Sequence, residues 1–214
     1  MKKIGLLIPK TNLTVEYELQ YLFNNNVLKH NELVFYISKL DYKTSYKENK
    51  EKYLKDLAED SFNKVQDLKY LGVDYISYFC TSSAIISEDL SIANNPAQAL
   101  VEEAKLKNIK TCLLITPYNK QLGEKVKAEL EKNKIEVHRA IHLNLVNTKD
   151  YFDFGIHKLK KFILENYQTQ DQNIIISCTN LPTLHLINEV EKKLKIQVIS
   201  SNSSLFAKII RENL

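Results

Sequence analysis

The chain has 214 residues, of which 44% are hydrophobic and 26% charged, and its formal net charge is +4. This length allows one large domain or two compact ones, and every apolar run is much shorter than the ~20 residues that span a bilayer. Lys and Arg alternate with acidic residues instead of forming a basic stripe, so we expect neither nucleic-acid binding nor a membrane partner.

Short apolar runs alternate with amphipathic stretches along the whole chain. The runs are rich in β-branched and aromatic residues, and in chain order they predict strands at residues 4–8, 33–37, 75–79, 111–115, 135–141, 174–177 and 197–199. Apolar residues at helical spacing predict helices at residues 52–71, 97–107, 122–132, 155–166 and 184–194. Strands that alternate with helices indicate an α/β fold with parallel sheets and helices on both faces.

The chain also contains an internal repeat. Residues 5–12 (GLLIPKTN) resemble residues 112–119 (CLLITPYN), and residues 78–82 (YFCTS) resemble residues 176–180 (ISCTN). In each half, one apolar strand ends in a Pro/Asn turn and a later strand ends in Cys-Thr. Two such pairs in the same order predict a duplicated unit, with two similar α/β halves related by pseudo-twofold symmetry and an active site between them.

The boundary between the halves is expected near the sequence Asn94-Asn95-Pro96. We predict an N-terminal half of residues 1–95 plus 200–214 and a C-terminal half of residues 96–199. No flexible linker separates them, so the halves should pack closely.

The three cysteines are too few for a disulfide framework. There is no CxxC pair and the five His are scattered, so no metal site is expected, and free thiols suit a reducing, cytoplasmic location. Cys112 lies inside an apolar run and is interpreted as a small core residue.

Cys80 and Cys178 stand at the ends of equivalent strands. Ligands of open parallel sheets bind beyond the carboxyl ends of the strands, so we expect both thiols to reach one pocket from opposite sides. Backbone N–H groups of the helix after each cysteine would lower the thiol pKa and bind an anion. Hydroxyl and amide groups that suit a substrate carboxylate follow the two cysteines directly: Thr81, Ser82, Thr179 and Asn180.

Two opposed thiols are suited to three related reactions. They can remove and return a proton on opposite faces of a carbon, which is racemisation. One can add to an activated double bond while the other handles a proton, which is cis–trans isomerisation. If only one is used, it can deliver a proton after decarboxylation.

Four motifs carry a resemblance to a known family. They are residues 5–16 (GLLIPKTNLTVE), 116–118 (TPY), 177–181 (SCTNL) followed by Thr183, and 200–202 (SSN). In this order they resemble the aspartate/glutamate racemase superfamily, and within it the maleate cis–trans isomerases and arylmalonate decarboxylases. The resemblance runs nearly from end to end of the chain.

The resemblance implies a role for each matching residue. Cys80 would be the nucleophile that adds to an olefinic carbon of maleate, and Cys178 the partner acid/base, with rotation and elimination giving fumarate. Substrate oxygens would be held by Asn12, Tyr118, Asn180 and, on a looser alignment, Asn147. It further implies a small carboxylate substrate and no metal or organic cofactor, and small α/β units of this kind often pair as homodimers.

Two alternatives remain open beside an isomerase of the maleate type. A racemase for aspartate, glutamate or a hydantoin-like compound would use the same two thiols. A non-catalytic small-acid binding protein is compatible with the same two-lobed scaffold. Decarboxylases of the group resemble one-cysteine versions, so the presence of both Cys80 and Cys178 argues against decarboxylation. Pro182 stands where maleate isomerases usually carry Arg, which bears on the substrate more than on the mechanism.

Overall fold

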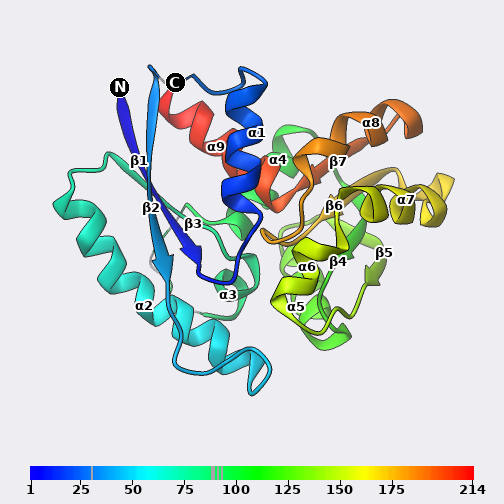
Figure 1. Ribbon diagram of the computed structural model, residues 1–214. Coiled ribbons are helices and arrows are strands. Elements are labelled where there is room, and N and C mark those ends of the chain that lie inside the picture. The colour runs from blue at the N-terminus through cyan, green and yellow to red at the C-terminus, as the bar shows by residue number, and fades with distance from the viewer. Residues whose placement is uncertain (30, 88–89, 91, 93) are drawn as a thin grey trace.

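The structure, a computed structural model, describes residues 1–29, 31–87, 90, 92 and 94–214. Two parallel sheets lie side by side in it (Figure 1). The first sheet contains β1 (Lys2–Pro9), β2 (Leu33–Leu40) and β3 (Tyr75–Tyr78) in the order β2-β1-β3. The second has the order β5-β4-β6-β7, with β4 (Thr111–Thr116), β5 (Glu136–His142), β6 (Asn173–Ile176) and β7 (Gln197–Ser200).

The two sheets explain the internal repeat. In each, the first strand of the half is central, with the second strand on one side and the third on the other, and every pairing is parallel. The α/β class with two parallel-sheet halves is therefore confirmed, and each predicted strand is present. Because β1 pairs with β3 and β4 with β6, the Pro/Asn turn and the Cys-Thr end lie next to each other in both halves.

Helices cover the sheets and account for most of the remaining chain. They are α1 (Val15–Asn24), α2 (Lys50–Tyr70), α3 (Thr81–Ile86), α4 (Pro96–Leu106), α5 (Lys120–Lys132), α6 (Thr148–Phe154), α7 (Ile156–Asn166), the 3-10 turn η1 (Thr169–Asp171), α8 (Leu184–Leu194) and α9 (Ser201–Asn213). The predicted helices correspond to α2, α4, α5, α7 and α8. No range was predicted for α1, α3, α6 or α9. In α1 a glutamate, Glu18, interrupts the buried stripe of Val15, Leu19 and Leu22.

Asparagine side chains set the start of three helices. Asn49 accepts a hydrogen bond from the third residue of α2, and Asn119 does the same for α5, at 3.0 and 3.1 Å. Asn95 accepts from two backbone N–H groups of α4, whose first residue is Pro96. These side chains satisfy N–H groups that have no partner within the helix, which fixes where each helix begins.

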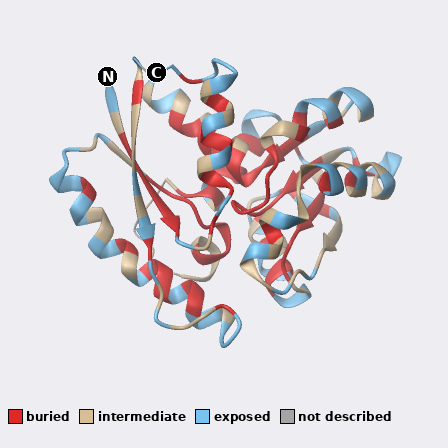
Figure 2. Ribbon diagram, in the orientation of Figure 1, coloured by how far each residue is buried: buried red, intermediate tan, exposed pale blue. Residues whose placement is uncertain are grey.

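The C-terminal helix α9 packs against the first half. Its residues Leu205, Phe206 and Ile209 share one apolar cluster with Ile4 and Leu6 of β1. In Figure 1 the red helix lies beside α1 and α4. Figure 2 shows the buried residues concentrated in the strands and where the two halves meet.

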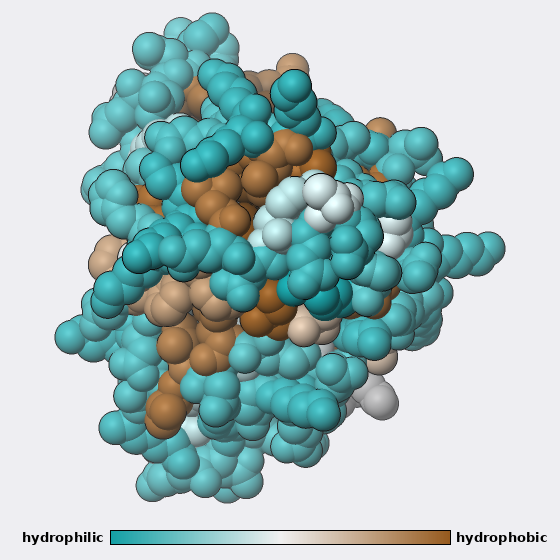
Figure 3. Space-filling model, turned by 90° about the vertical axis from the view of Figure 1, so that its right-hand side faces the viewer, coloured by the Kyte–Doolittle hydropathy of each residue, from teal (hydrophilic) through white to brown (hydrophobic). Residues whose placement is uncertain are grey.

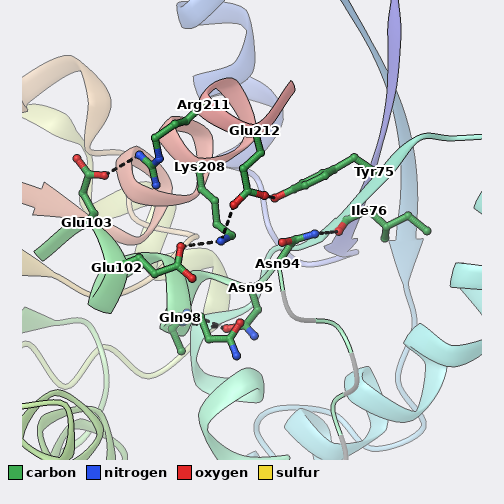
Figure 4. Close-up of polar contacts among 11 residues, drawn as sticks. Tyr75, Ile76, Asn94, Asn95, Gln98, Glu102, Glu103, Lys208, Arg211 and Glu212 are labelled. Carbon is green, nitrogen blue, oxygen red and sulfur yellow. Dashed lines mark hydrogen bonds and ion pairs between the residues drawn. The ribbon is translucent and has the colours of Figure 1, made fainter. Parts of the chain in front are cut away.

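A buried lysine ties α9 to its neighbours (Figure 4). The Lys208 ammonium lies 2.6 Å from Glu102 of α4 and 2.8 Å from Glu212 of α9. The hydroxyl of Tyr75, on β3, donates to Glu212 at 2.7 Å. This network joins α4 and α9 to the first residue of β3 in the first sheet. No helix in the described ranges is both long and apolar enough to cross a membrane.

Candidate active site

A small pocket lies beyond the carboxyl ends of the strands and takes residues from both halves. Its cavity volume is about 30 Å³, room for one or two water molecules. Its lining residues are Pro9, Thr11, Asn12, Tyr46, Tyr53, Leu54, Cys80, Thr81, Ser82, Tyr118, Thr148, Tyr151, Cys178, Thr179 and Asn180. Both predicted cysteines therefore face one pocket, as expected from the repeat.

Cys80 follows β3 and is the N-cap residue of α3. Backbone N–H groups of Ser82 and Ser83 point at its sulfur, and the Ser82 hydroxyl lies 3.8 Å away. The thiol is 8% exposed, and its burial raises the pKa to about 11 despite these donors. The expectation of a lowered pKa is therefore wrong for the resting site, because desolvation of a thiolate outweighs the N–H groups.

Cys178 follows β6, but the next helix, α8, begins only at Leu184. The expected strand-to-helix turn is a loop instead, and Pro182 lies in that loop. The Asn180 N–H donates to the Cys178 sulfur at 3.3 Å, and the Tyr118 phenol also contacts it. Burial raises the Cys178 pKa to about 12, so the expected lowering is wrong here too.

The two cysteines influence each other electrostatically. A negative charge on Cys80 raises the pKa of Cys178 further. Since both thiols are buried, the pocket disfavours two thiolates at once. Within the described structure, the other side chains of the lining are uncharged. A carboxylate bound here would therefore rely on neutral donors.

The two predicted asparagines hold the loops of the pocket together. Asn12 accepts from the backbone N–H groups of Thr14 and Val15 at the start of α1, and donates to the Thr179 hydroxyl at 3.2 Å. Asn180 accepts from the backbone N–H of Leu13 at 2.9 Å. Its amide nitrogen donates to the carbonyls of Thr11 and Thr148. Asn180 thus uses both ends of its amide within the protein, whereas one N–H of the Asn12 amide has no acceptor in the part of the chain that the structure describes.

The two predicted threonines also make bonds within the protein. The Thr81 hydroxyl donates to Ser201 of α9 at 2.8 Å. The Thr179 hydroxyl donates to the carbonyl of Phe79, at the end of β3, at 2.9 Å. Since Thr179 belongs to the second sheet's loop, this bond links the two halves directly beside both cysteines.

Three tyrosines of the lining were missed in the sequence. The hydroxyls of Tyr46 and Tyr151 lie 2.8 Å apart, and that of Tyr53 is 2.7 Å from Thr11. Burial raises the pKa of Tyr46 to about 12, so its phenol is a neutral donor. Tyr53 lies on the buried stripe of α2, and a tyrosine among leucines at such a position could have indicated a hydroxyl that faces a pocket. Tyr46 and Tyr151 had no such signal, because only the packing of the halves brings them together.

Asn147 is not among the lining residues. Its amide nitrogen donates to Asp150 at 2.8 Å, while its buried carbonyl oxygen has no hydrogen-bond partner in the described structure. Its neighbour Thr148 does line the pocket.

Residues 91–213, more than half of the chain, match the family model of arylmalonate decarboxylase. The chain belongs to the arylmalonate decarboxylase family. This family assignment covers Cys178 and its loop, whereas the likeness around Cys80 comes from relatives matched over nearly the whole chain. The maleate isomerase of Geobacillus stearothermophilus is 22% identical over 98% of this chain and 90% of its own length.

Solved structures show that this family member shares its fold with maleate isomerases. The Pseudomonas putida enzyme, solved with maleate, has a TM-score of 0.86 at 19% identity, covering 99% of this chain and 91% of its own. A mutant maleate cis–trans isomerase of Nocardia farcinica, solved with a covalently bound succinylcysteine intermediate, has a TM-score of 0.83 at 20% identity. That match covers 98% of this chain and 91% of the Nocardia chain.

Proposed function

We propose that this protein is a cofactor-independent isomerase of a small dicarboxylic acid, which converts a cis double bond to trans as in maleate-to-fumarate isomerisation. The observation that carries the proposal is the pair of free thiols, Cys80 and Cys178, in one pocket with neutral donors. The full-length relatives named maleate isomerase support it, as does the fold shared with an isomerase that forms a succinylcysteine.

In the proposed reaction Cys80 acts as a thiolate and Cys178 as a thiol. The Cys80 sulfur adds to one olefinic carbon, and the Cys178 proton goes to the other. This leaves a succinyl thioether on Cys80 and a thiolate on Cys178. After rotation about the new C–C single bond, Cys178 takes a proton back and the C–S bond breaks. The trans acid leaves, and both sulfurs return to their starting states.

The electrostatics of the pocket suit this exchange. At the start and in the thioether, only one sulfur is charged, which avoids the repulsion between two buried thiolates. Both pKa values are raised in the resting site, so Cys80 must release its proton to solvent before it attacks. The N–H groups of Ser82 and Ser83 are the donors that stabilise the resulting thiolate.

The proposed substrate-binding residues fall into two groups, according to whether their polar side chains are already hydrogen-bonded within the protein. Ser82, Tyr118 and the spare N–H of Asn12 are assigned to the substrate carboxylates. Thr81, Thr179 and Asn180 keep the walls of the pocket in place through their bonds within the protein. Asn147 does not line the pocket, so we propose that it contacts the substrate only when the segment that carries Asn147 and Thr148 moves toward the pocket.

Maleate turnover followed by ¹H NMR tests the proposal. We expect fumarate to form with the wild type and with Cys112→Ala, because Cys112 lies inside β4 away from the pocket. Cys80→Ser and Cys178→Ser should each lose at least about 100-fold in kcat, the typical minimum contribution of a positioned acid–base group. No turnover by a protein whose Cys80 thiol is intact would refute the proposal.

A racemase is the second candidate, because the equivalent placement of both thiols also suits proton exchange on two faces of a carbon. Incubation with L-aspartate, L-glutamate and a hydantoin in D₂O separates the two reactions. Deuterium at Cα would favour the racemase, and its absence from all three substrates would exclude it for them.

We also propose a cytoplasmic homodimer. The three free cysteines favour a reducing compartment. Apolar side chains gather near the middle of the face shown in Figure 3, among hydrophilic ones, which supports pairing with a second copy. Within each subunit, we propose the division into residues 1–95 with 200–214 and residues 96–199. Light scattering in solution tests the dimer.

A further inference from the structure

Glu18 is a buried carboxylate on α1, behind the pocket and outside its lining. It is 0% exposed. One oxygen accepts from the backbone N–H of Thr183 and, at 2.7 Å, from that of Leu184. The Thr183 hydroxyl donates to the same oxygen at 3.3 Å, and the amide of Asn202 donates to the other. Among the described residues, Glu18 has no ion-pair partner, so hydrogen-bond donors alone satisfy its carboxylate.

Two of these three donor residues belong to the loop that carries Cys178 and to the helix that follows it. Thr183 and Leu184 form the end of that loop and the start of α8. Asn202, on α9, uses the same amide nitrogen to donate to the carbonyl of Thr179 at 3.0 Å. Glu18 therefore holds the far end of residues 179–184 directly and the near end through Asn202.

The near end of the loop controls the surroundings of the thiol. Thr179 directly follows Cys178, and the Asn180 N–H is the backbone donor to its sulfur at 3.3 Å. The Thr14 hydroxyl, in the first half, donates to the Asn180 carbonyl at 2.8 Å. A shift of the 179–184 segment would move this N–H and open the cover over the thiol.

The charge of Glu18 also decides how Asn202 is oriented. An ionised carboxylate only accepts, so Asn202 must present its nitrogen, and its buried carbonyl oxygen has no partner in the described structure. A protonated Glu18 would offer an O–H donor. The Asn202 carbonyl oxygen can accept from it only if the Asn202 amide turns. Turning would remove the nitrogen from the Thr179 carbonyl. Burial raises the Glu18 pKa to about 7, so both forms are accessible near neutrality.

We propose that Glu18 is a positioning residue for Cys178, whose ionised carboxylate fixes the loop of residues 179–184 and the amide of Asn202. The effect on catalysis rests on the proposed function, whereas the effect on the thiol does not. Glu18 touches neither the pocket nor the sulfur, so its influence is transmitted by the loop.

Site-resolved alkylation tests the proposal. Wild type and Glu18→Gln are treated with iodoacetamide at pH 8, and the rate at each cysteine is followed by peptide mass spectrometry. We expect the rate at Cys178 to rise roughly tenfold, since one lost hydrogen bond to a charged group changes an opening equilibrium by about that factor. The rate at Cys80 should change less than about twofold, because its donors lie on α3.

Two matched variants control for trivial effects. Glu16→Gln makes the same change on α1, at a residue paired with Lys39 near the surface. Asp171→Asn alters another fully buried carboxylate, which pairs with Arg139 in the second half. Both should leave the ratio of the two alkylation rates unchanged. An equal rise at both cysteines, no rise at Cys178, or the same ratio change in Asp171→Asn would overturn the proposal.

A second variant covers the case in which Glu18→Gln does not fold. Asn202→Ala removes the amide that joins Glu18 to the Thr179 carbonyl and leaves the bonds from Thr183 and Leu184 to Glu18 in place. We expect the same selective rise at Cys178; an unchanged ratio overturns the proposal. With maleate, Glu18→Gln should lower kcat with little change in KM. If the wild type does not turn over maleate, the proposed function fails while the alkylation ratio still decides the role of Glu18.

Discussion

Tyr46 and Tyr151 lie 105 residues apart in the chain, yet their hydroxyls share a buried 2.8 Å hydrogen bond. Tyr46 precedes α2 in the first half, and Tyr151 lies on α6 in the second. Both line the pocket. The bond therefore joins the two halves at the site itself.

Replacing one of these tyrosines should weaken the junction. We expect Tyr46→Phe to lower the free energy of unfolding by about 1–2 kcal/mol, because the Tyr151 hydroxyl loses its partner. Urea denaturation measures the change. Tyr70→Phe is the matched control, since Tyr70 is 92% exposed. The double variant with Tyr151→Phe should cost less than the sum of the singles, and full additivity would contradict a coupled pair.

The thiols should react slowly at neutral pH. Burial raises the pKa of Cys80 to about 11 and that of Cys178 to about 12, so only about one thiol in 10⁴ or fewer is ionised at pH 7. The iodoacetamide rate at each should rise about tenfold per pH unit up to pH 10, because the thiolate is the reacting form. A rate that reaches half of its maximum near pH 8.5 and levels off above about pH 9.5, as for an exposed thiol, would show that the resting site does not suppress ionisation.

Glu18 should make stability depend on pH. Its pKa is raised by burial to about 7 from 4.5, so between these values the folded protein binds a proton that the unfolded chain has released. The contribution of Glu18 to the free energy of unfolding is fully present below pH 4.5 and is lost as the pH rises through 7. The loss is on the order of 3 kcal/mol, from 1.36 kcal/mol per pKa unit.

Comparison with Glu18→Gln isolates that contribution. Urea denaturation at several pH values gives the stability difference between wild type and variant. The difference should shift in favour of the variant between pH 4.5 and 7 and level off above. A constant difference across this range would mean that Glu18 keeps an ordinary pKa.

Lys208 should contribute to stability without affecting the chemistry. Its ammonium bridges Glu102 and Glu212 (Figure 4), and none of these three residues lines the pocket. We expect Lys208→Ala to lower the free energy of unfolding by about 1–3 kcal/mol, because two carboxylates lose a charged partner. Thermal unfolding measures this, with Lys193→Ala on the exposed side of α8 as control. A drop in kcat without a drop in stability would contradict a purely structural role.

Local patterns in the sequence determined the strands and most helices. Apolar β-branched runs and asparagine helix caps act over a few residues, so they can be read without the fold. The repeat then placed Cys80 and Cys178 at equivalent strand ends, because parallel strands in a duplicated unit end at the same edge. Helix α1 escaped prediction, since its stripe contains Glu18, whose donors come from residues 183, 184 and 202.

The sequence by itself determined that Cys80 and Cys178 stand at equivalent strand ends, and the tertiary structure decided the state in which the two thiols are held. Each cysteine has N–H donors nearby, which alone favour a thiolate. Only the packing of the two halves shows that both sulfurs are buried, and the cost of desolvating a thiolate then outweighs the donors. The same packing placed the Tyr46 hydroxyl beside that of Tyr151 and engaged the Asn180 amide in hydrogen bonds within the protein. Burial and long-range contacts arise from residues far apart in the chain, so no local pattern specifies them.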